Sequence, residues 1–187
     1  MRQQVLNWLK DNVPTSRLSH VIRVEQMAVE LAICHNLDTH KAASAGLMHD
    51  LAKYFGSDKL LEIARANGLK LDEVMKATPH LLHADASAIV AKTTFNVQDE
   101  EVLQAIANHT LGRPAMNMLS CIVFLADSLE PGRGDSEELQ ALRSMSYENL
   151  YKAVYLTCDR TLRKLLLSSK LIHPRVIETR NWFLVNS

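Results

Sequence analysis

Almost every segment of this 187-residue chain repeats its apolar residues with the period of an α-helix. We find no run of β-branched residues that alternates with polar ones, as a half-buried strand would require. The pattern therefore predicts an all-α fold. The chain also lacks an internal repeat, a low-complexity tract and a convincing linker, and its length suits one domain covering 1–187.

Proline, glycine and capping residues divide the chain into helices. Pro14 ends the first helix, Gly56 and Gly68 enclose a short one, and Gly112 and the 131–134 loop end two others. The predicted helices cover residues 2–11, 15–35, 39–54, 57–67, 72–77, 78–92, 99–109, 117–129, 136–145, 147–168 and 176–184.

Composition excludes several classes of protein. Lys and Arg number 21, as do Asp and Glu, and this neutral balance argues against nonspecific nucleic-acid binding, which needs a basic surface. The most apolar run, residues 121–126, is far too short to span a bilayer. The N-terminus does not resemble a signal peptide, and the three cysteines show no pairing pattern. We therefore expect a cytoplasmic protein without membrane or nucleic-acid partners.

The adjacent His49 and Asp50 are unusual because apolar residues flank them on both sides. Burying an ionised carboxylate costs several kcal/mol unless a partner or a metal compensates it. A core histidine beside a solvated aspartate is the alternative, since adjacent helix positions point about 100° apart. The apolar flanks leave no obvious polar face for Asp50, so we weigh a ligand role equally with that alternative.

His20 and Asp127 also lie among apolar neighbours, and with the His49–Asp50 pair they form a set of two imidazoles and two carboxylates. Such a set suits one divalent transition metal. Each signal alone is weak: His20 could be a histidine bonded to a backbone carbonyl, and His109, at a helix end, could simply favour the helix dipole.

The order of these residues is more specific than any one of them. His20, His49–Asp50, His83, His109 and Asp127 follow the pattern of HD-domain metal phosphohydrolases, and the sequence resembles the YqeK family of bacterial HD hydrolases. The resembling segments are Ser19–Val21, His49–Lys53, His83–Asp85, Asn108–Arg113, Ala126–Arg133, Ser169–Pro174 and Arg180–Asn181.

The resemblance implies an HD-domain helical bundle whose metal lies between helices, held by His20, His49, Asp50 and Asp127. Its implied activity is the symmetrical hydrolysis of diadenosine tetraphosphate to two ADP by a metal-bound hydroxide. Iron is the metal we expect first, with manganese or cobalt as alternatives, because such ligand sets bind several ions.

The remaining expected site residues contact the substrate. Lys53, His83 and His109 are the predicted catalytic residues; the two histidines could bind phosphate oxygens, protonate the departing ADP or hold a second metal, and these roles stay open. The predicted substrate-binding residues are Lys53, His83, His109, Thr110, Arg133, Lys170, Ile172 and His173.

Three other interpretations compete with this one. Another HD phosphohydrolase, acting on a deoxynucleotide, a cyclic nucleotide or a guanosine polyphosphate, would share the metal site and differ in the pocket. A non-catalytic, nucleotide-sensing HD module is weaker because no ligand is missing, and a purely structural bundle gives no reason for Asp50 and Asp127. The oligomeric state stays open, a homodimer included.

Overall fold

The computed structural model describes residues 1–187 and contains helices and no strands, so the predicted all-α fold is confirmed. The α-helices are α1 (Arg2–Asn12), α2 (Thr15–Cys34), α3 (Thr39–Met48), α4 (Ser57–Ala66), α5 (Glu73–Ala77), α6 (His83–Phe95), α7 (Glu100–Asn108), α8 (Met118–Leu129), α9 (Glu137–Glu148), α10 (Leu150–Leu167) and α11 (Pro174–Val185). Two short 3₁₀ helices, η1 (Pro79–Leu82) and η2 (Pro131–Arg133), join α5 to α6 and α8 to α9.

Side-chain caps set several of the helix starts. Asp38, Asp72, Asp99 and Asn117 each accept hydrogen bonds from backbone N–H groups in the first turn of the helix that follows. Asp38 thus caps α3, which begins at Thr39. At the other end, Gly68 adopts a positive φ of 68°, as expected for a residue that terminates a helix.

The structure corrects two predicted helices. The helix predicted over 39–54 ends at Met48, and the chain continues in tight turns. In these turns the backbone N–H of Lys53 donates to the backbone oxygen of Asp50. Ser87 Oγ accepts from the buried Ala52 N–H and stabilises this departure. The helix predicted over 78–92 starts as the 3₁₀ helix η1, because Pro79 fixes the first turn, and becomes α-helical at His83.

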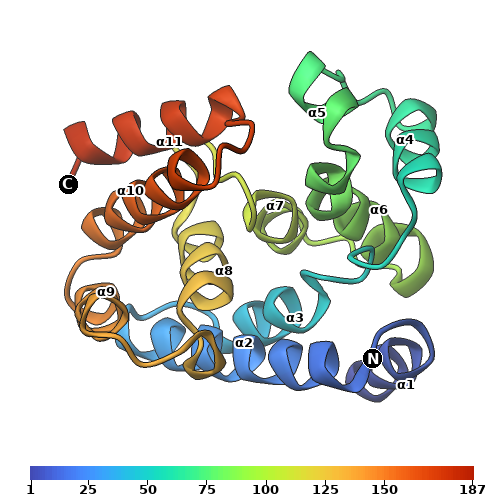
Figure 1. Ribbon diagram of the computed structural model, residues 1–187. Helices are drawn as coiled ribbons and strands as arrows, with labels where there is room; N and C mark the ends of the chain where they lie inside the picture. The colour runs from blue at the N-terminus through green and yellow to red at the C-terminus, as the bar shows by residue number, and fades with distance from the viewer.

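The core is one continuous cluster of 45 buried hydrophobic residues. α8 runs through its centre, and its residues are buried almost without a break from Leu119 to Ala126. α2 and α3 pack on one side of α8, α7 on another, and α9, α10 and α11 form the C-terminal group (Figure 1). No helix combines the length and the apolar character that a bilayer crossing requires.

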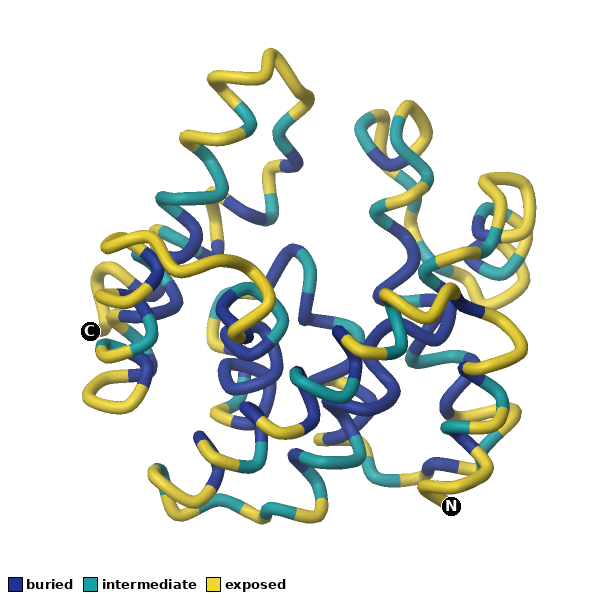
Figure 2. Tube along the Cα trace, turned by 60° about the horizontal axis from the view of Figure 1, so that its bottom comes forward, coloured by how far each residue is buried: buried dark blue, intermediate teal, exposed yellow.

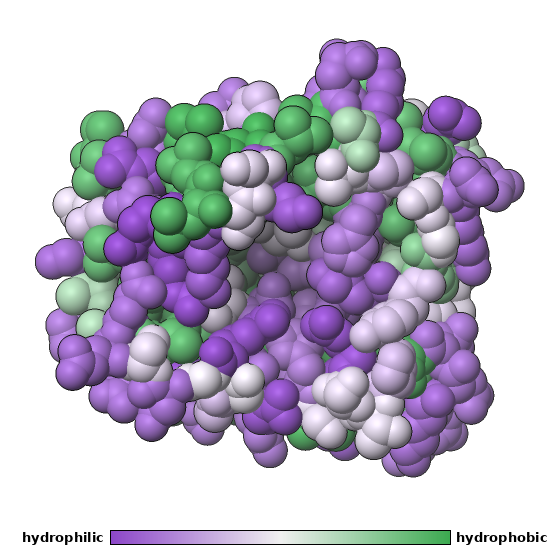
Figure 3. Space-filling view, in the orientation of Figure 1, coloured by the Kyte–Doolittle hydropathy of each residue, from purple (hydrophilic) through white to green (hydrophobic).

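The α10–α11 pair and the α4–α5 arm stand on opposite sides of the molecule, with α3, α7 and α8 between them (Figure 1). In Figure 2 the tube is dark blue, meaning buried, through the middle of the molecule and yellow at its periphery. Figure 3 shows that this face is hollowed at its centre and that hydrophilic atoms line the hollow.

Candidate metal centre and nucleotide site

The structure brings together the four residues that the sequence predicts as metal ligands. His20 Nε2 lies 3.0 Å from Asp127 Oδ1 and 3.9 Å from Asp50 Oδ2. His49 Nε2 lies 3.3 Å from Asp50 Oδ2 and 3.7 Å from Asp127 Oδ1. His20 comes from α2, His49 and Asp50 follow α3, and Asp127 lies in the last turn of α8. A buried His/Asp metal-binding cluster therefore lies between these helices.

The turn after α3 explains how two adjacent residues both reach this cluster. In a continuous helix, His49 and Asp50 would point about 100° apart. Because the helix ends at Met48, both side chains point into the interior, with exposed fractions of 0% and 1%.

A second group of side chains, formed by Lys53, His83 and His109, faces the other oxygen of Asp50, Oδ1. Asp50 Oδ1 lies 3.4 Å from His83 Nε2 and 3.6 Å from His109 Nε2, and the two Nε2 atoms are 3.1 Å apart. Lys53 Nζ lies 3.0 Å from His83 Nε2 and 4.0 Å from Asp50 Oδ1. The Asp50 carboxylate thus joins the predicted metal ligands to the predicted catalytic residues.

All four buried imidazoles direct Nδ1 at an oxygen atom. The Nδ1 atoms of His49, His83 and His109 lie 2.6–2.7 Å from the backbone oxygens of Gly46, His80 and Ile106. The Nδ1 atom of His20 lies 3.0 Å from Glu130 Oε1. Since carbonyl and carboxylate oxygens only accept, each Nδ1 carries a hydrogen, and Nε2 is the ring atom that can coordinate a metal.

Several of the atoms that converge here have no partner. His20 Nε2, His49 Nε2 and Asp50 Oδ1 are buried without a hydrogen bond, an arrangement that folded proteins avoid unless something else binds there. Neutral imidazole nitrogens and carboxylate oxygens are suitable donors for a divalent transition metal. The residues present therefore fit a metal ion.

The charges of the cluster favour a cation as well. Burial works to raise the pKa of Asp50, but the neighbouring His49, His109 and Lys53 side chains hold it well below its usual range. Burial likewise acts to raise the pKa of Asp127, yet the neighbouring His20 and His49 side chains keep it low. Both carboxyl groups are therefore ionised at neutral pH and attract a positive charge.

The second group is held neutral at the imidazole and positive at the lysine. Burial, with the nearby charges of His109 and Lys53, lowers the pKa of His83 well below its usual range. Burial also lowers the pKa of Lys53, although Asp50 opposes this shift. A neutral ring beside an ammonium group can form hydrogen bonds with a phosphate group.

Arginines complete the surroundings of the carboxylates. Arg133 Nη2 lies 2.6 Å from Asp127 Oδ1, and its Nε donates to the backbone oxygen of Asp127 at 2.7 Å. Arg17 Nη1 donates to Asp50 Oδ2 at 3.0 Å, and its side chain keeps 21% of its surface exposed. Both guanidinium groups lie where an anionic ligand could reach them.

A cavity of about 270 Å³ adjoins the second group. Thr110 lines it, and the hydroxyl of Thr110 lies 3.1 Å from His83 Nε2, which connects the cavity to the metal-binding cluster. Lys170 and His173 also line it, whereas Ile172 is half-buried and is not among the lining residues. His173 Nε2 also lies 2.7 Å from Asp72 Oδ2, at the start of α5.

Sequence reasoning missed two residues of the site, Arg17 and Glu130. Arg17 resembles an ordinary charged residue in the first turn of an amphipathic helix. Glu130 is only 1% exposed and contacts both His20 and Arg23, and burial is opposed by these hydrogen bonds, so its pKa stays below the usual range. The one signal for Glu130 was its place in the resembling segment Ala126–Arg133, directly before Pro131.

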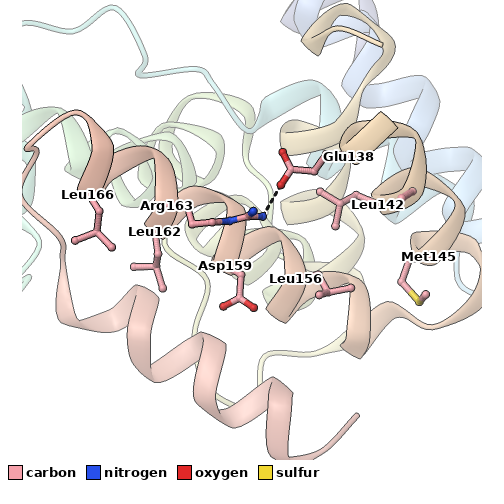
Figure 4. A pocket seen from close by; sticks show the side chains of 9 residues that line it. Glu138, Leu142, Met145, Leu156, Asp159, Leu162, Arg163 and Leu166 are labelled. Atoms are coloured by element: carbon pink, nitrogen blue, oxygen red, sulfur yellow. Dashed lines mark hydrogen bonds and ion pairs between the residues drawn. The ribbon is translucent and has the colours of Figure 1, made fainter. Parts of the chain in front are cut away.

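A larger cavity lies elsewhere, between α9 and α10, and it contains none of the predicted site residues. Its volume is about 520 Å³, and its walls carry leucines together with Glu138, Asp159 and Arg163 (Figure 4). Glu138 pairs with Arg163 and with Arg160 across the groove. Its charged groups are therefore already paired with one another, in contrast to the orphaned atoms of the metal-binding cluster.

Comparison with known proteins agrees with this geometry. Residues 17–132 match the model of the HD domain family. The chain is 32% identical to the symmetrical bis(5'-nucleosyl)-tetraphosphatase of Staphylococcus aureus over 93% of this chain and 90% of that protein. It is also 32% identical to the enzyme of the same name from Halalkalibacterium halodurans, covering 98% and 97% of the two chains.

A solved structure supports the fold over the full length. It is a Clostridium acetobutylicum protein described as a predicted HD superfamily hydrolase involved in NAD metabolism, which superposes with a TM-score of 0.95 at 35% identity and covers 100% of this chain and 98% of its own. With the matched segment including His20, the His49–Asp50 pair and Asp127, the chain belongs to the HD-domain family, in the group of the symmetrical bis(5'-nucleosyl)-tetraphosphatases.

Proposed function

We propose that this protein hydrolyses diadenosine tetraphosphate symmetrically, releasing two molecules of ADP, with a divalent metal as cofactor. One observation carries the proposal: Asp50 joins the metal-ligand set to His83, and Thr110 joins His83 to a cavity. A metal, cationic groups and a nucleoside-sized space thus adjoin one another. The names of the full-length relatives supply the substrate class.

His20, His49, Asp50 and Asp127 are the residues we assign to the metal. When bound, a divalent ion supplies Lewis acidity, which polarises a phosphoryl oxygen and lowers the pKa of water to about 7. We propose iron as the native ion, with manganese and cobalt as the ions to compare, because histidine–carboxylate sets with open positions are typical of non-haem iron sites.

Lys53, His83, His109 and Arg133 are the residues we assign to the phosphate groups. Hydrolysis of a phosphoric anhydride needs the attacking and leaving oxygens in line and positive charge on the equatorial oxygens. Lys53, beside Asp50, and Arg133, beside Asp127, provide that charge. The Nε2 atoms of His83 and His109 lie beside Lys53, where they can hold a proton for the departing ADP.

Thr110, Lys170, Ile172 and His173 are the residues we assign to one nucleoside half of the substrate. Lys170 and His173 line the cavity together with Thr110, which contacts His83, so an ADP moiety there could extend its phosphates toward His83. We propose that residues 1–187 act as one domain, which the single continuous core supports. The three free cysteines fit a reducing, cytoplasmic environment.

A product assay tests this function. Purified protein loaded with Fe²⁺, Mn²⁺ or Co²⁺ is incubated with diadenosine tetraphosphate, and the nucleotides are separated by ion-exchange chromatography. We expect ADP as the only product. ATP together with AMP would contradict symmetrical cleavage, and faster turnover of a deoxynucleoside triphosphate, a cyclic nucleotide or a guanosine polyphosphate would support the alternative HD hydrolase.

A further inference from the structure

Glu130 lies at the end of α8, directly before η2, and no role has so far been assigned to it. We propose that Glu130 is a positioning residue that fixes His20 in the tautomer and orientation needed for metal binding. We propose further that the same carboxylate holds the turn that carries Arg133. The inference rests on the proposed metal site at His20.

The carboxylate of Glu130 accepts hydrogen bonds from three residues, His20, Arg23 and Gly132. His20 Nδ1 lies 3.0 Å from Oε1, Arg23 Nη2 lies 3.3 Å from Oε1, and the Gly132 N–H donates to Oε2 at 2.6 Å. Arg23 Nε also donates to Oε2. Both oxygens are therefore in use, and Glu130 accepts from a side chain of α2, a second side chain of α2 and the backbone of η2.

His20 differs from the other imidazoles in how its ring is held. His49, His83 and His109 each donate Nδ1–H to a backbone oxygen three residues earlier, so their own turns orient them. His20 donates to a side chain from a distant part of the sequence. Consequently one substitution at Glu130 can release the His20 ring without disturbing the backbone that carries it.

Glu130 also binds the turn that carries Arg133, the residue we assign to the phosphate groups. Gly132 packs so closely on the guanidinium of Arg23 that a side chain at this position would collide with it. Arg133, the next residue, then lies against Asp127 at 2.6 Å. Glu130 thus aligns a metal ligand and a phosphate-facing cation by means of one buried carboxylate, comparable to the carboxylate–histidine pairs that orient ligands at other metal sites.

The substitution Glu130→Gln tests this role because an amide has a single acceptor oxygen. Two donors, Arg23 Nε and Gly132 N, face Oε2, so the amide oxygen takes that place and the NH₂ group faces His20. His20 would then accept at Nδ1 and carry its hydrogen on Nε2, the atom that must be free for the metal. The matched control is Glu25→Gln, since Glu25 is also buried and binds an arginine, Arg2, on the α1 side of α2.

Two measurements that need no nucleotide decide the matter. Nitrogen-15 NMR of the metal-free protein reports the tautomer of His20, and titration with Co²⁺ reports metal affinity. We expect a hydrogen on Nδ1 in the wild type and in Glu25→Gln, no hydrogen on Nδ1 in Glu130→Gln, and a loss of roughly 10–100-fold in Co²⁺ affinity for Glu130→Gln alone.

The proposal is overturned by a wild-type His20 that carries no hydrogen on Nδ1, a result that requires no variant to fold. It is equally overturned by a Glu130→Gln protein that keeps both the wild-type tautomer and the wild-type Co²⁺ affinity. Failure of the proposed hydrolase activity would appear only in the product assay, so the two failures are distinguishable.

Discussion

His20 Nε2 lies 3.0 Å from Asp127 Oδ1, at the point where α2 meets the end of α8. Because Nδ1 of His20 carries the ring hydrogen, a lone pair and a carboxylate oxygen face each other at this distance. Two electron-rich atoms this close repel each other unless a proton or a metal ion lies between them. The relationship is therefore the strongest local argument that a cation belongs here.

The first prediction removes one carboxylate charge from this point. Asp127→Asn keeps the side-chain volume but weakens a metal ligand, so we expect Co²⁺ affinity to fall by more than about 100-fold, since even residues outside the coordination sphere contribute roughly 10–100-fold. Hydrolysis of diadenosine tetraphosphate should be lost with the metal. Asp159→Asn is the control, because Asp159 also pairs with an arginine, Arg180, but lies outside the cluster. Full activity in Asp127→Asn would refute the ligand assignment.

The second prediction separates phosphate binding from metal binding. Lys53→Met removes the ammonium beside His83 while keeping a long apolar stem, so the metal content should match that of the wild type. Loss of a hydrogen bond to a charged group is worth about 1.5–3 kcal/mol, which corresponds to a rise in KM of roughly tenfold or more. Lys41→Met, at a surface ion pair with Asp99, should leave KM unchanged. A Lys53→Met protein that loses its metal would show that Lys53 acts on the ligands.

The third prediction concerns Arg17, which lies on the same Asp50 oxygen as the metal-ligand histidines. Its positive charge opposes a metal ion, whereas it should attract the phosphates of the substrate. Arg17→Met is therefore expected to raise Co²⁺ affinity and, at the same time, to raise KM for diadenosine tetraphosphate. Arg2→Met, which breaks the pair with Glu25, should change neither quantity. Parallel weakening of both metal and substrate binding would indicate a structural role for Arg17 instead.

Sequence patterns predicted the helices well where proline, glycine or a capping side chain ends them. They failed at the turn after Met48, because an apolar run of this kind continues a helix in the absence of tertiary contacts. The hydrogen bond from the buried Ala52 N–H to Ser87, a residue of α6, is a tertiary contact that favours the turn. This turn allows the side chains of His49 and Asp50 to point into the same metal-binding cluster, which a regular helix would prevent.

The ligand set could be predicted because its residues are chemically unusual among apolar neighbours. Arg17 and Glu130 could not be predicted in this way, since charged residues near helix ends are ordinarily exposed. Their roles depend on contacts between α2 and the α8–η2 junction, and such contacts leave no mark on the local pattern.

The last prediction tests how the loop after α7 places Thr110. Gly112 has a φ of 63°, and a Cβ there would lie 2.5 Å from Thr179 Cγ2 of α11, whose hydroxyl donates to the oxygen of Leu111. Gly112→Ala must therefore push the loop away from α11 in addition to straining its backbone. Gly68→Ala is the matched control, because Gly68 has a φ of 68° with open space around it. We expect about 1–2 kcal/mol of destabilisation in Gly68→Ala from the left-handed conformation alone. In Gly112→Ala we expect roughly 1–3 kcal/mol more from overpacking, measured by urea unfolding, and a higher KM because Thr110 moves. Equal destabilisation of the two variants would mean that the loop accommodates the methyl group, and the contact between the loop and α11 would then not determine the position of Thr110.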